Sequence, residues 1–252
     1  LILIGRDTRL SGEMFEAALT AGICSAGGRA MLAGVIPTPA IAYLAHRHKA
    51  KAGIVISASH NPFYDNGIKF FGGDGYKLPD AVEEELEELV MSYTEEMARP
   101  VAEKIGTLSV RHDYTKHYID YLLQTVDVDF TGMKVVVDCA NGAAFEVAPV
   151  VYKRLGAEVI VLNHRPNGIN INDKCGSTHL EMLQKAVVEH QADIGVAHDG
   201  DADRCLMVDE KGQVVDGDKI MVVCALELMR QNKLKDNTLV TTVMSNIGLH
   251  QA

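Results

Sequence analysis

The sequence lacks the features that would place it in a secreted or membrane class. The five cysteines are an odd number and no pair has the CxxC spacing, which argues against a disulfide framework and favours free thiols in a reducing cytosol. No signal peptide is visible, and Pro37 and Pro39 interrupt the most apolar segment, residues 31–45. We therefore expect a cytoplasmic protein with no membrane partner.

Positive charge is also scarce. The chain has 24 Lys and Arg against 34 Asp and Glu, which gives a formal net charge of −10. This balance argues against nucleic acid or an anionic membrane as the general partner, although a locally positive cleft can still bind a sugar phosphate. The length of 252 residues and the hydrophobic content of 47% are those of a globular protein with one large or two ordinary domains.

What the sequence does contain is a repeated unit of strand, polar turn, helix and strand. Residues 1–32 have this order, residues 134–162 repeat it, and residues 239–243 begin it again with a predicted strand. Successive βαβ units with right-handed crossovers form parallel or mixed sheets covered by helices. We therefore predict an α/β fold made of repeated domains with mixed β-sheets.

The repeated units are separated by segments of other kinds. Residues 80–97 predict a helix whose acidic face we assign to solvent, and an irregular stretch near residue 108 suits a linker. We therefore predict three domains, at residues 1–108, 109–213 and 214–252. Because the sequence opens without Met inside a strand and the third unit stops early, we expect a longer protein, with the first and third domains truncated.

The first candidate site follows a short apolar strand at residues 54–56. The polar loop Ser57-Ala58-Ser59-His60-Asn61-Pro62 comes at the carboxyl end of this strand, where α/β proteins place reactive groups. A turn at residues 64–67 predicts a hairpin into a second strand that carries Lys69. We therefore expect the Lys69 ammonium group to lie beside the serine loop and to meet a charged substrate there.

Two other interpretations of this loop compete with a phosphoryl-carrying serine. Ser59, His60 and Asn61 could merely satisfy the turn through their own hydrogen bonds, as such residues usually do. A Ser-His hydrolase is a further alternative, but Ser59 lacks the glycine-flanked elbow, and neighbours in an extended loop point to opposite sides. The loop alone does not decide among these interpretations.

The second candidate site lies between two predicted strands, at residues 194–197 and 205–208. Asp199, Asp201 and Asp203 alternate with small residues there, and in a locally extended backbone alternate residues face the same side. Three converging carboxylates require a cation, and ligands that are all oxygen suit Mg²⁺, Ca²⁺ or Mn²⁺ rather than zinc. We therefore predict a metal site at these three aspartates.

Two other interpretations of the aspartates are weaker. An EF-hand begins with the same alternation, but Arg204 occupies its obligatory glycine position and the flanking elements are strands. A solvated acidic turn is the second, yet Arg204 directly follows the third aspartate between two apolar strands, which indicates a built site.

Together the two segments supply the groups that phosphoryl transfer needs. These are a serine, the nearby His60 and Lys69, Arg204 and a metal loop. Free ATP is a poor candidate donor, because the sequence has no P-loop, no kinase signature and no GxGxxG fingerprint. This combination favours a phosphoryl group carried by Ser59 itself.

The two segments resemble the hallmark motifs of the α-D-phosphohexomutase family, which here read SASHNP at 57–62 and DGDADR at 199–204. Longer stretches extend the resemblance along nearly the whole chain, and they are similar to the branch that acts on glucosamine phosphates rather than to the phosphomannomutases: GIVISASHNPFYDNGIKFF, VVVDCANGAA, PNGININDKCGSTH and TVMSNIGL. One departure is Ala202, where glycine is usual in that branch. It adds a methyl group and should leave the carboxylates usable.

The resemblance implies a role for each candidate residue. Ser59 would be phosphorylated, and a phosphate oxygen would join the three aspartates around Mg²⁺. His60 and Lys69 would orient the transferring group or assist proton transfer. Arg204 would stabilise phosphate charge, and Arg9 would support the site.

The resemblance also implies a reaction and a substrate. Glucosamine 6-phosphate would be converted to glucosamine 1-phosphate through a 1,6-bisphosphate, on the route to UDP-N-acetylglucosamine. The partner would be a hexosamine phosphate, and the oligomeric state is open, with a homodimer among the expectations. The family's Glu-x-Ser-Gly-His sugar-binding loop and its fourth-domain phosphate loop do not occur in this sequence, so we expect this chain alone to be inactive.

Three alternatives remain beside this reading. They are a phosphomannomutase or phosphoglucomutase of the same family, a metal-dependent sugar-phosphate phosphatase, and a non-catalytic module that binds sugar phosphates.

Overall fold

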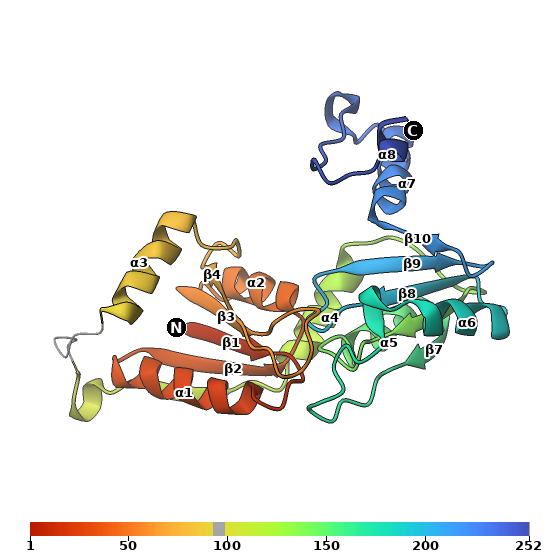
Figure 1. The fold of residues 1–252 in the computed structure, drawn as a ribbon. Helices are drawn as coiled ribbons and strands as arrows, with labels where there is room; N and C mark the ends of the chain where they lie inside the picture. Colours follow the sequence, from red (N-terminus) through yellow and green to blue (C-terminus); the bar gives the residue numbers. More distant parts are fainter. Residues whose placement is uncertain (93–98, 252) are drawn as a thin grey trace.

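The computed structural model describes residues 1–92 and 99–251, which form two β-sheets with helices on their faces and a helical C-terminal segment (Figure 1). The first sheet and its helices comprise β1 (Ile2–Arg6), α1 (Gly12–Ser25), β2 (Arg29–Val35), α2 (Thr38–Arg47), β3 (Ala52–Ile56), β4 (Ile68–Gly72), α3 (Asp80–Met91) and β5 (Thr107–Val110). The rest comprises α4 (Tyr114–Gln124), β6 (Lys134–Asp138), α5 (Val147–Arg154), β7 (Glu158–Leu162), α6 (Glu181–Glu189), β8 (Ile194–His198), β9 (Cys205–Asp209), β10 (Val214–Val215), α7 (Gly217–Arg230) and α8 (Ile247–Gln251).

The first sheet has the strand order β4–β3–β1–β2–β5. Strands β3, β1, β2 and β5 are parallel, and β4 pairs antiparallel with β3 at the edge. Successive residues of each strand point to opposite faces, so Ile4 and Ile54 belong to the core under α1, whereas Leu3 and Val55 belong to the core under α2. Burial on both faces explains why the inner strands read as continuous apolar runs.

The second sheet has the order β10–β9–β8–β6–β7 and the same plan. Strand β6 is parallel to β7 and β8, and β9 runs antiparallel to β8. Val135 and Val137 pack with Ala148 of α5, and Val136 packs with Leu183 of α6 on the other face. The structure therefore confirms the predicted α/β class with two mixed, helix-covered sheets.

Helix α4 joins the two sheets. Its buried Tyr118 and Ile119 share a core with Leu44 of α2 and Val147 of α5. In Figure 1 the sheets lie side by side across this helix, and α7 and α8 extend from the β10 edge of the second sheet. The loops after β1 and β6 meet between the sheets, where Thr8 Oγ1 donates to the Asn141 carbonyl oxygen at 2.6 Å.

Two predicted elements need correction or restriction. Residues 239–243 do not form the predicted strand, and Val240 and Val243 are exposed, because no strand in the described part of the chain lies beside them to accept their hydrogen bonds. The predicted helix over 80–97 is observed as α3 as far as Met91, and residues 93–97 lie outside the described residues.

The domain boundaries stay predictions. Both sheets extend slightly past them, since β5 continues the first sheet beyond residue 108 and β10 adds Val214 and Val215 to the second. Across residues 1–92 and 99–251, every helix is too short or too polar to traverse a lipid bilayer.

Candidate active site

The serine loop begins where β3 ends at Ile56 and is held in an uncommon conformation. Ser59 has φ of +54°, a left-handed value that side chains with a Cβ adopt only where surrounding contacts require it. One such contact is local, because the Ser59 amide donates to Ser57 Oγ at 2.9 Å. Ser57 Oγ in turn donates to Asp7 Oδ2 at 2.6 Å, which ties the loop to the end of β1.

Arg9 holds the backbone of the same loop through hydrogen bonds. Its Nε donates to Asp7 Oδ2 at 2.9 Å, and its two terminal nitrogens donate to the carbonyl oxygens of Ser59, Asn61, Pro62 and Asp65. The residue is only 2% exposed. Arg9 therefore positions the loop backbone, and its guanidinium does not face the cleft where a substrate would bind.

The Asp7 carboxylate that receives these bonds lies in the interior. Burial raises the pKa of Asp7, and the Arg9 charge and the Ser57 hydroxyl act in the opposite direction. Arg9 and Asp7 form a buried ion pair whose remaining hydrogen-bonding groups are satisfied by the loop, the arrangement in which such pairs persist.

The serine loop meets the acidic loop across the two sheets. Ser59 Oγ donates to Asp199 Oδ2 at 2.7 Å, a contact between residues 140 positions apart. Asn172 strengthens the meeting, because its Nδ2 donates to the carbonyl oxygens of Ser59 and Asn61 at 2.9 and 3.0 Å. Gly200 permits it, since a Cβ there would lie 2.6 Å from the Ser59 carbonyl oxygen.

The acidic loop connects β8 to β9 and gathers its carboxylates by a turn. The Ala202 amide donates to the Asp199 carbonyl oxygen at 3.1 Å, and Ala202 has φ of +56°. The extended backbone assumed from the sequence is therefore wrong, although the expected convergence occurs. One ligand atom from each of Asp199, Asp201 and Asp203 lies within 4.8 Å of the others.

The acidic residues are arranged as a cation site would require. Asp199 and Asp201 are 0% exposed, and Asp201 Oδ1 is buried without a hydrogen-bond partner in the described part of the chain. Burial raises the pKa of Asp199, the neighbouring Asp201 and Asp203 charges raise it further, and the Ser59 hydrogen bond opposes them. A donor set of carboxylate oxygens with one orphaned atom fits a hard divalent cation.

Two basic side chains flank the carboxylates. Lys69 lies on β4 opposite Val55 of β3, and its Nζ donates to Asp201 Oδ2 at 2.6 Å and to Asp203 Oδ2 at 3.0 Å. Burial alone would lower the pKa of Lys69, but the two carboxylates outweigh it and raise the pKa. Arg204 is half exposed, with Nε 4.0 Å from Asp199 Oδ2.

His60 belongs to the serine loop but lies beside the cluster of carboxylates rather than within it. It lines a cavity of about 550 Å³ together with Asn172, Lys174 and His179 of the loop after β7, and its Nδ1 is buried without a partner among the described residues. The structure thus brings Ser59, the three aspartates, Lys69 and Arg204 into one cluster, with His60 beside it and Arg9 beneath it.

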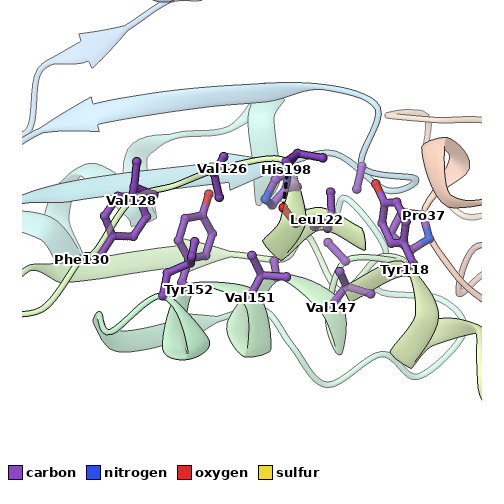
Figure 2. A pocket seen from close by; sticks show the side chains of 15 residues that line it. Pro37, Tyr118, Leu122, Val126, Val128, Phe130, Val147, Val151, Tyr152 and His198 are labelled. Atoms are coloured by element: carbon purple, nitrogen blue, oxygen red, sulfur yellow. Dashed lines mark hydrogen bonds between the residues drawn. The ribbon is translucent and has the colours of Figure 1, made fainter. Parts of the chain in front are cut away.

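A second cavity, of about 330 Å³, lies behind the acidic loop (Figure 2). Its lining comes from α4, the segment after α4, α5, His198 and Ala202, and Figure 2 shows Val147 and Val151 opposite His198. Burial lowers the pKa of His198. Because this lining is almost entirely apolar, the cavity does not suit a sugar phosphate.

Sequence reasoning missed four residues that build the site. Asp7, Ser57, Thr38 and Asn172 act through hydrogen bonds to residues that are distant in sequence. Asp7 and Ser57 each stand two residues before a predicted site residue, Arg9 and Ser59, and Asn172 lies in the stretch PNGININDKCGSTH. No local pattern distinguishes Thr38.

Three family models match the chain in the order of their domains. Residues 1–97 match phosphoglucomutase/phosphomannomutase alpha/beta/alpha domain I, residues 116–212 match domain II and residues 216–252 match domain III. Together they cover most of the chain.

Individual proteins give the same picture. The chain is 57% identical to the phosphoglucosamine mutase of Pelotomaculum thermopropionicum over 100% of its own length, and 54% identical to that of Syntrophomonas wolfei over 98%. It spans 56% of the length of each of these relatives. A phosphoglucomutase/phosphomannomutase family protein from Burkholderia thailandensis has a similar structure, with a TM-score of 0.77 at 26% identity over 92% of this chain and 51% of that one.

Proposed function

Because the chain belongs to the phosphoglucomutase/phosphomannomutase family, we propose that it carries the phosphoserine and metal loops of a phosphoglucosamine mutase, an isomerase that interconverts glucosamine 6-phosphate and glucosamine 1-phosphate. The relatives with that name, at 54% and 57% identity, support this substrate. Since the chain spans 56% of their length, the activity is proposed for the whole protein. The observation that carries the chemistry is the contact between Ser59 Oγ and Asp199.

Ser59 is the proposed carrier of the phosphoryl group. In the forward direction the phosphoserine gives its phosphoryl group to O1 of glucosamine 6-phosphate, and the bond from phosphorus to Ser59 Oγ breaks. The hydroxyl proton of O1 leaves the sugar, and Ser59 Oγ is protonated in turn. After the 1,6-bisphosphate has turned around, the O6 phosphoryl group returns to Ser59 Oγ and the bond from phosphorus to O6 breaks. Ser59 Oγ gives up its proton, O6 is protonated, and glucosamine 1-phosphate is released.

The neighbouring residues orient the groups and hold protons. Lys69, the basic group nearest to Asp201 and Asp203, is placed to contact a phosphoryl group on Ser59 and to take part in proton transfer. Arg204 adds positive charge at the open side of the cluster. His60 faces the adjoining cavity and is proposed to orient the sugar phosphate there. Arg9 keeps the Ser59 backbone in place.

Asp199, Asp201, Asp203 and Ser59 would hold the metal ion, for which Mg²⁺ is our proposal. When bound, Mg²⁺ neutralises negative charge on the oxygens of the phosphoryl group. The need for it follows from charge, because a phosphoserine adds about −1.5 to −2 beside three carboxylates. The two positive charges of Lys69 and Arg204 are too few to neutralise the phosphoserine and the three carboxylates together.

The test of the carrier is transfer of labelled phosphate in the full-length enzyme. We expect Ser59→Ala to abolish exchange of label between phosphoenzyme and substrate, because no other hydroxyl occupies that place. Ser57→Ala is the matched control, since it loosens the same loop but leaves the nucleophile, and it should retain measurable exchange. Label exchange or mutase activity in Ser59→Ala would refute the assignment.

Product analysis separates the mutase from a phosphatase. Phosphorus NMR of the full-length enzyme with glucosamine 6-phosphate should show the 1-phosphate signal growing without free phosphate. Accumulation of inorganic phosphate would contradict the proposal and favour hydrolysis. The substrate itself is tested by kcat/KM for glucosamine and glucose phosphates measured side by side, with the glucosamine ester expected to be preferred.

A further inference from the structure

Thr38, at the start of a helix on the first sheet, contacts the acidic loop of the second sheet. It follows Ile36 and Pro37 after β2 and is the first residue of α2, where it is only 5% exposed. Its backbone N–H is one of the first-turn donors that have no acceptor within a helix. This N–H donates to the Asp201 carbonyl oxygen at 2.9 Å.

The Thr38 side chain contacts the same residue. Its Oγ1 donates to Asp201 Oδ2 at 2.5 Å, so backbone and side chain together fix the position of Asp201 relative to α2. The bond has little freedom, because a β-branched side chain in a helix has few χ1 rotamers and Thr38 is enclosed. Lys69 donates to the same Oδ2 atom, but it does so from a long side chain that is 31% exposed.

These bonds make the two oxygens of the Asp201 carboxylate different. Oδ2 is taken by Thr38 and Lys69, whereas Oδ1 is buried and has no hydrogen-bond partner in the described ranges. A buried carboxylate oxygen without a partner is costly unless a cation or donor reaches it. Oδ1 is therefore the Asp201 atom left for a metal ion.

We infer that Thr38 is a positioning residue for the metal site, which holds Asp201 by Oδ2 so that Oδ1 remains directed at the cation. The inference rests on the proposed metal site at Asp199, Asp201 and Asp203. It adds that metal affinity depends on a hydroxyl from the opposite sheet, and so on the docking of the two sheets. Groups that orient metal ligands in this way typically change affinity by about 10- to 100-fold when removed.

The chain offers a matched control in Thr8. Its Oγ1 also crosses between the sheets, donating to the Asn141 carbonyl oxygen at 2.6 Å, and it is similarly buried, at 8% exposed. It touches no carboxylate of the metal loop. Thr8→Val thus removes an equivalent bond between the sheets without touching Asp201.

The experiment is titration of the protein with Mg²⁺ by calorimetry and with Mn²⁺ by electron paramagnetic resonance. We expect Thr38→Val, which keeps the shape and removes the hydroxyl, to weaken binding by about 10- to 100-fold. Thr38→Ser should restore most of the affinity, and Thr8→Val should bind nearly as the wild type does. Unchanged affinity in Thr38→Val, or an equal loss in Thr8→Val, would overturn the inference.

A measurement on the wild-type protein covers the case in which Thr38→Val does not fold. The amide resonance of Thr38 should shift during Mg²⁺ titration with the same Kd as binding, whereas that of Thr8 should stay in place. A stationary Thr38 resonance during saturable binding would overturn the inference alone. If the wild-type protein binds no divalent cation, the proposed metal site is wrong, and so is the inference that rests on it.

Discussion

At the scale of single residues, Ser59, the proposed phosphoryl carrier, is held by groups that are themselves buried. Arg9 and Asp7 have side chains that are 1% and 0% exposed, and between them they fix the loop through its carbonyl oxygens and the Ser57 hydroxyl. The left-handed backbone of Ser59 depends on these bonds. Site geometry is therefore linked to the stability of a buried ion pair.

We predict that Arg9→Met destabilises the protein by about 3 to 5 kcal/mol, because it leaves the Asp7 charge buried without its partner. Urea unfolding at neutral pH measures the change. Arg230→Met is the control, since the Arg230–Glu227 pair is exposed and pairs of that kind contribute at most about 1 kcal/mol. Equal effects of the two substitutions would contradict a structural role for Arg9.

Gly200 gives a second prediction at this scale. Its missing side chain lets the acidic loop approach Ser59, so Gly200→Ala should destabilise the protein by about 1 to 3 kcal/mol through overpacking and weaken metal binding. Gly22→Ala provides the contrast, because an added Cβ at this position of α1 meets nothing within 4 Å and should stabilise the helix by about 0.5 to 1 kcal/mol. Thermal unfolding of both variants decides whether the close approach matters.

At the scale of elements, each loop is presented by a pair of antiparallel strands. Strands β3 and β4 flank the serine loop, and β8 and β9 flank the acidic loop. Each pair continues a parallel sheet whose carboxyl ends point to the same junction. The helices that close this junction, α2 and α4, pack through Tyr118 and the end of α2 at His48.

The packing of His48 predicts a pH effect. Burial lowers the pKa of His48 below its ordinary value of about 6.5, and the Arg111 and Arg47 charges add to the shift, while Asp113 opposes it. Between the folded and unfolded pKa values the unfolded chain binds more protons, so stability is lost as pH falls below about 6.5. The ring lies 5.0 Å from that of Tyr114 on α4, at the contact between the two helices.

We expect His48→Gln to reduce the loss of stability between pH 7.5 and pH 5, because glutamine keeps hydrogen-bonding capacity without titrating. Urea unfolding at the two pH values gives the difference for each protein. An identical difference in the variant and the wild type would show that His48 does not contribute to the acid sensitivity.

At the scale of the whole molecule, the proposed ion binds where the two sheets meet. Ser59 comes from the first sheet and the three aspartates come from the second, so a cation between them would bridge the two units. Ligands that bind only the folded state stabilise it by about 2.7 kcal/mol at a concentration 100 times their Kd. Metal binding should therefore stabilise the docked arrangement.

We predict that Mg²⁺ raises the unfolding temperature of the wild-type protein and that Asp201→Asn removes most of this increase, because Asp201 supplies the buried unpartnered oxygen. Differential scanning calorimetry with Mg²⁺ and with a chelator measures the difference in unfolding temperature. Asp209→Asn, at the far end of β9 and outside the cluster, should keep the full increase. A normal increase in Asp201→Asn would count against the metal loop.

Much of this organisation follows from the sequence alone. Strand and helix periodicity predicted the α/β class. The turn predicted at residues 64–67 is observed slightly earlier, at residues 63–64, but the chain returns as predicted in a strand that carries Lys69 beside β3. These features depend on interactions between near neighbours, so short stretches contain the information. The strand predicted at residues 239–243 was wrong because a strand also needs a partner, which its own residues do not specify.

The sequence by itself determined which chemical groups are available: a serine after one strand, three aspartates after another, and basic residues near both. Only the tertiary structure decided that Ser59 and Asp199 touch, that Arg9 is enclosed while Arg204 is half exposed, and that Thr38 holds Asp201. The physical reason is that these contacts arise from the docking of two sheets. That docking buries apolar side chains of α2, α4 and α5, and no short segment encodes which loops it brings together.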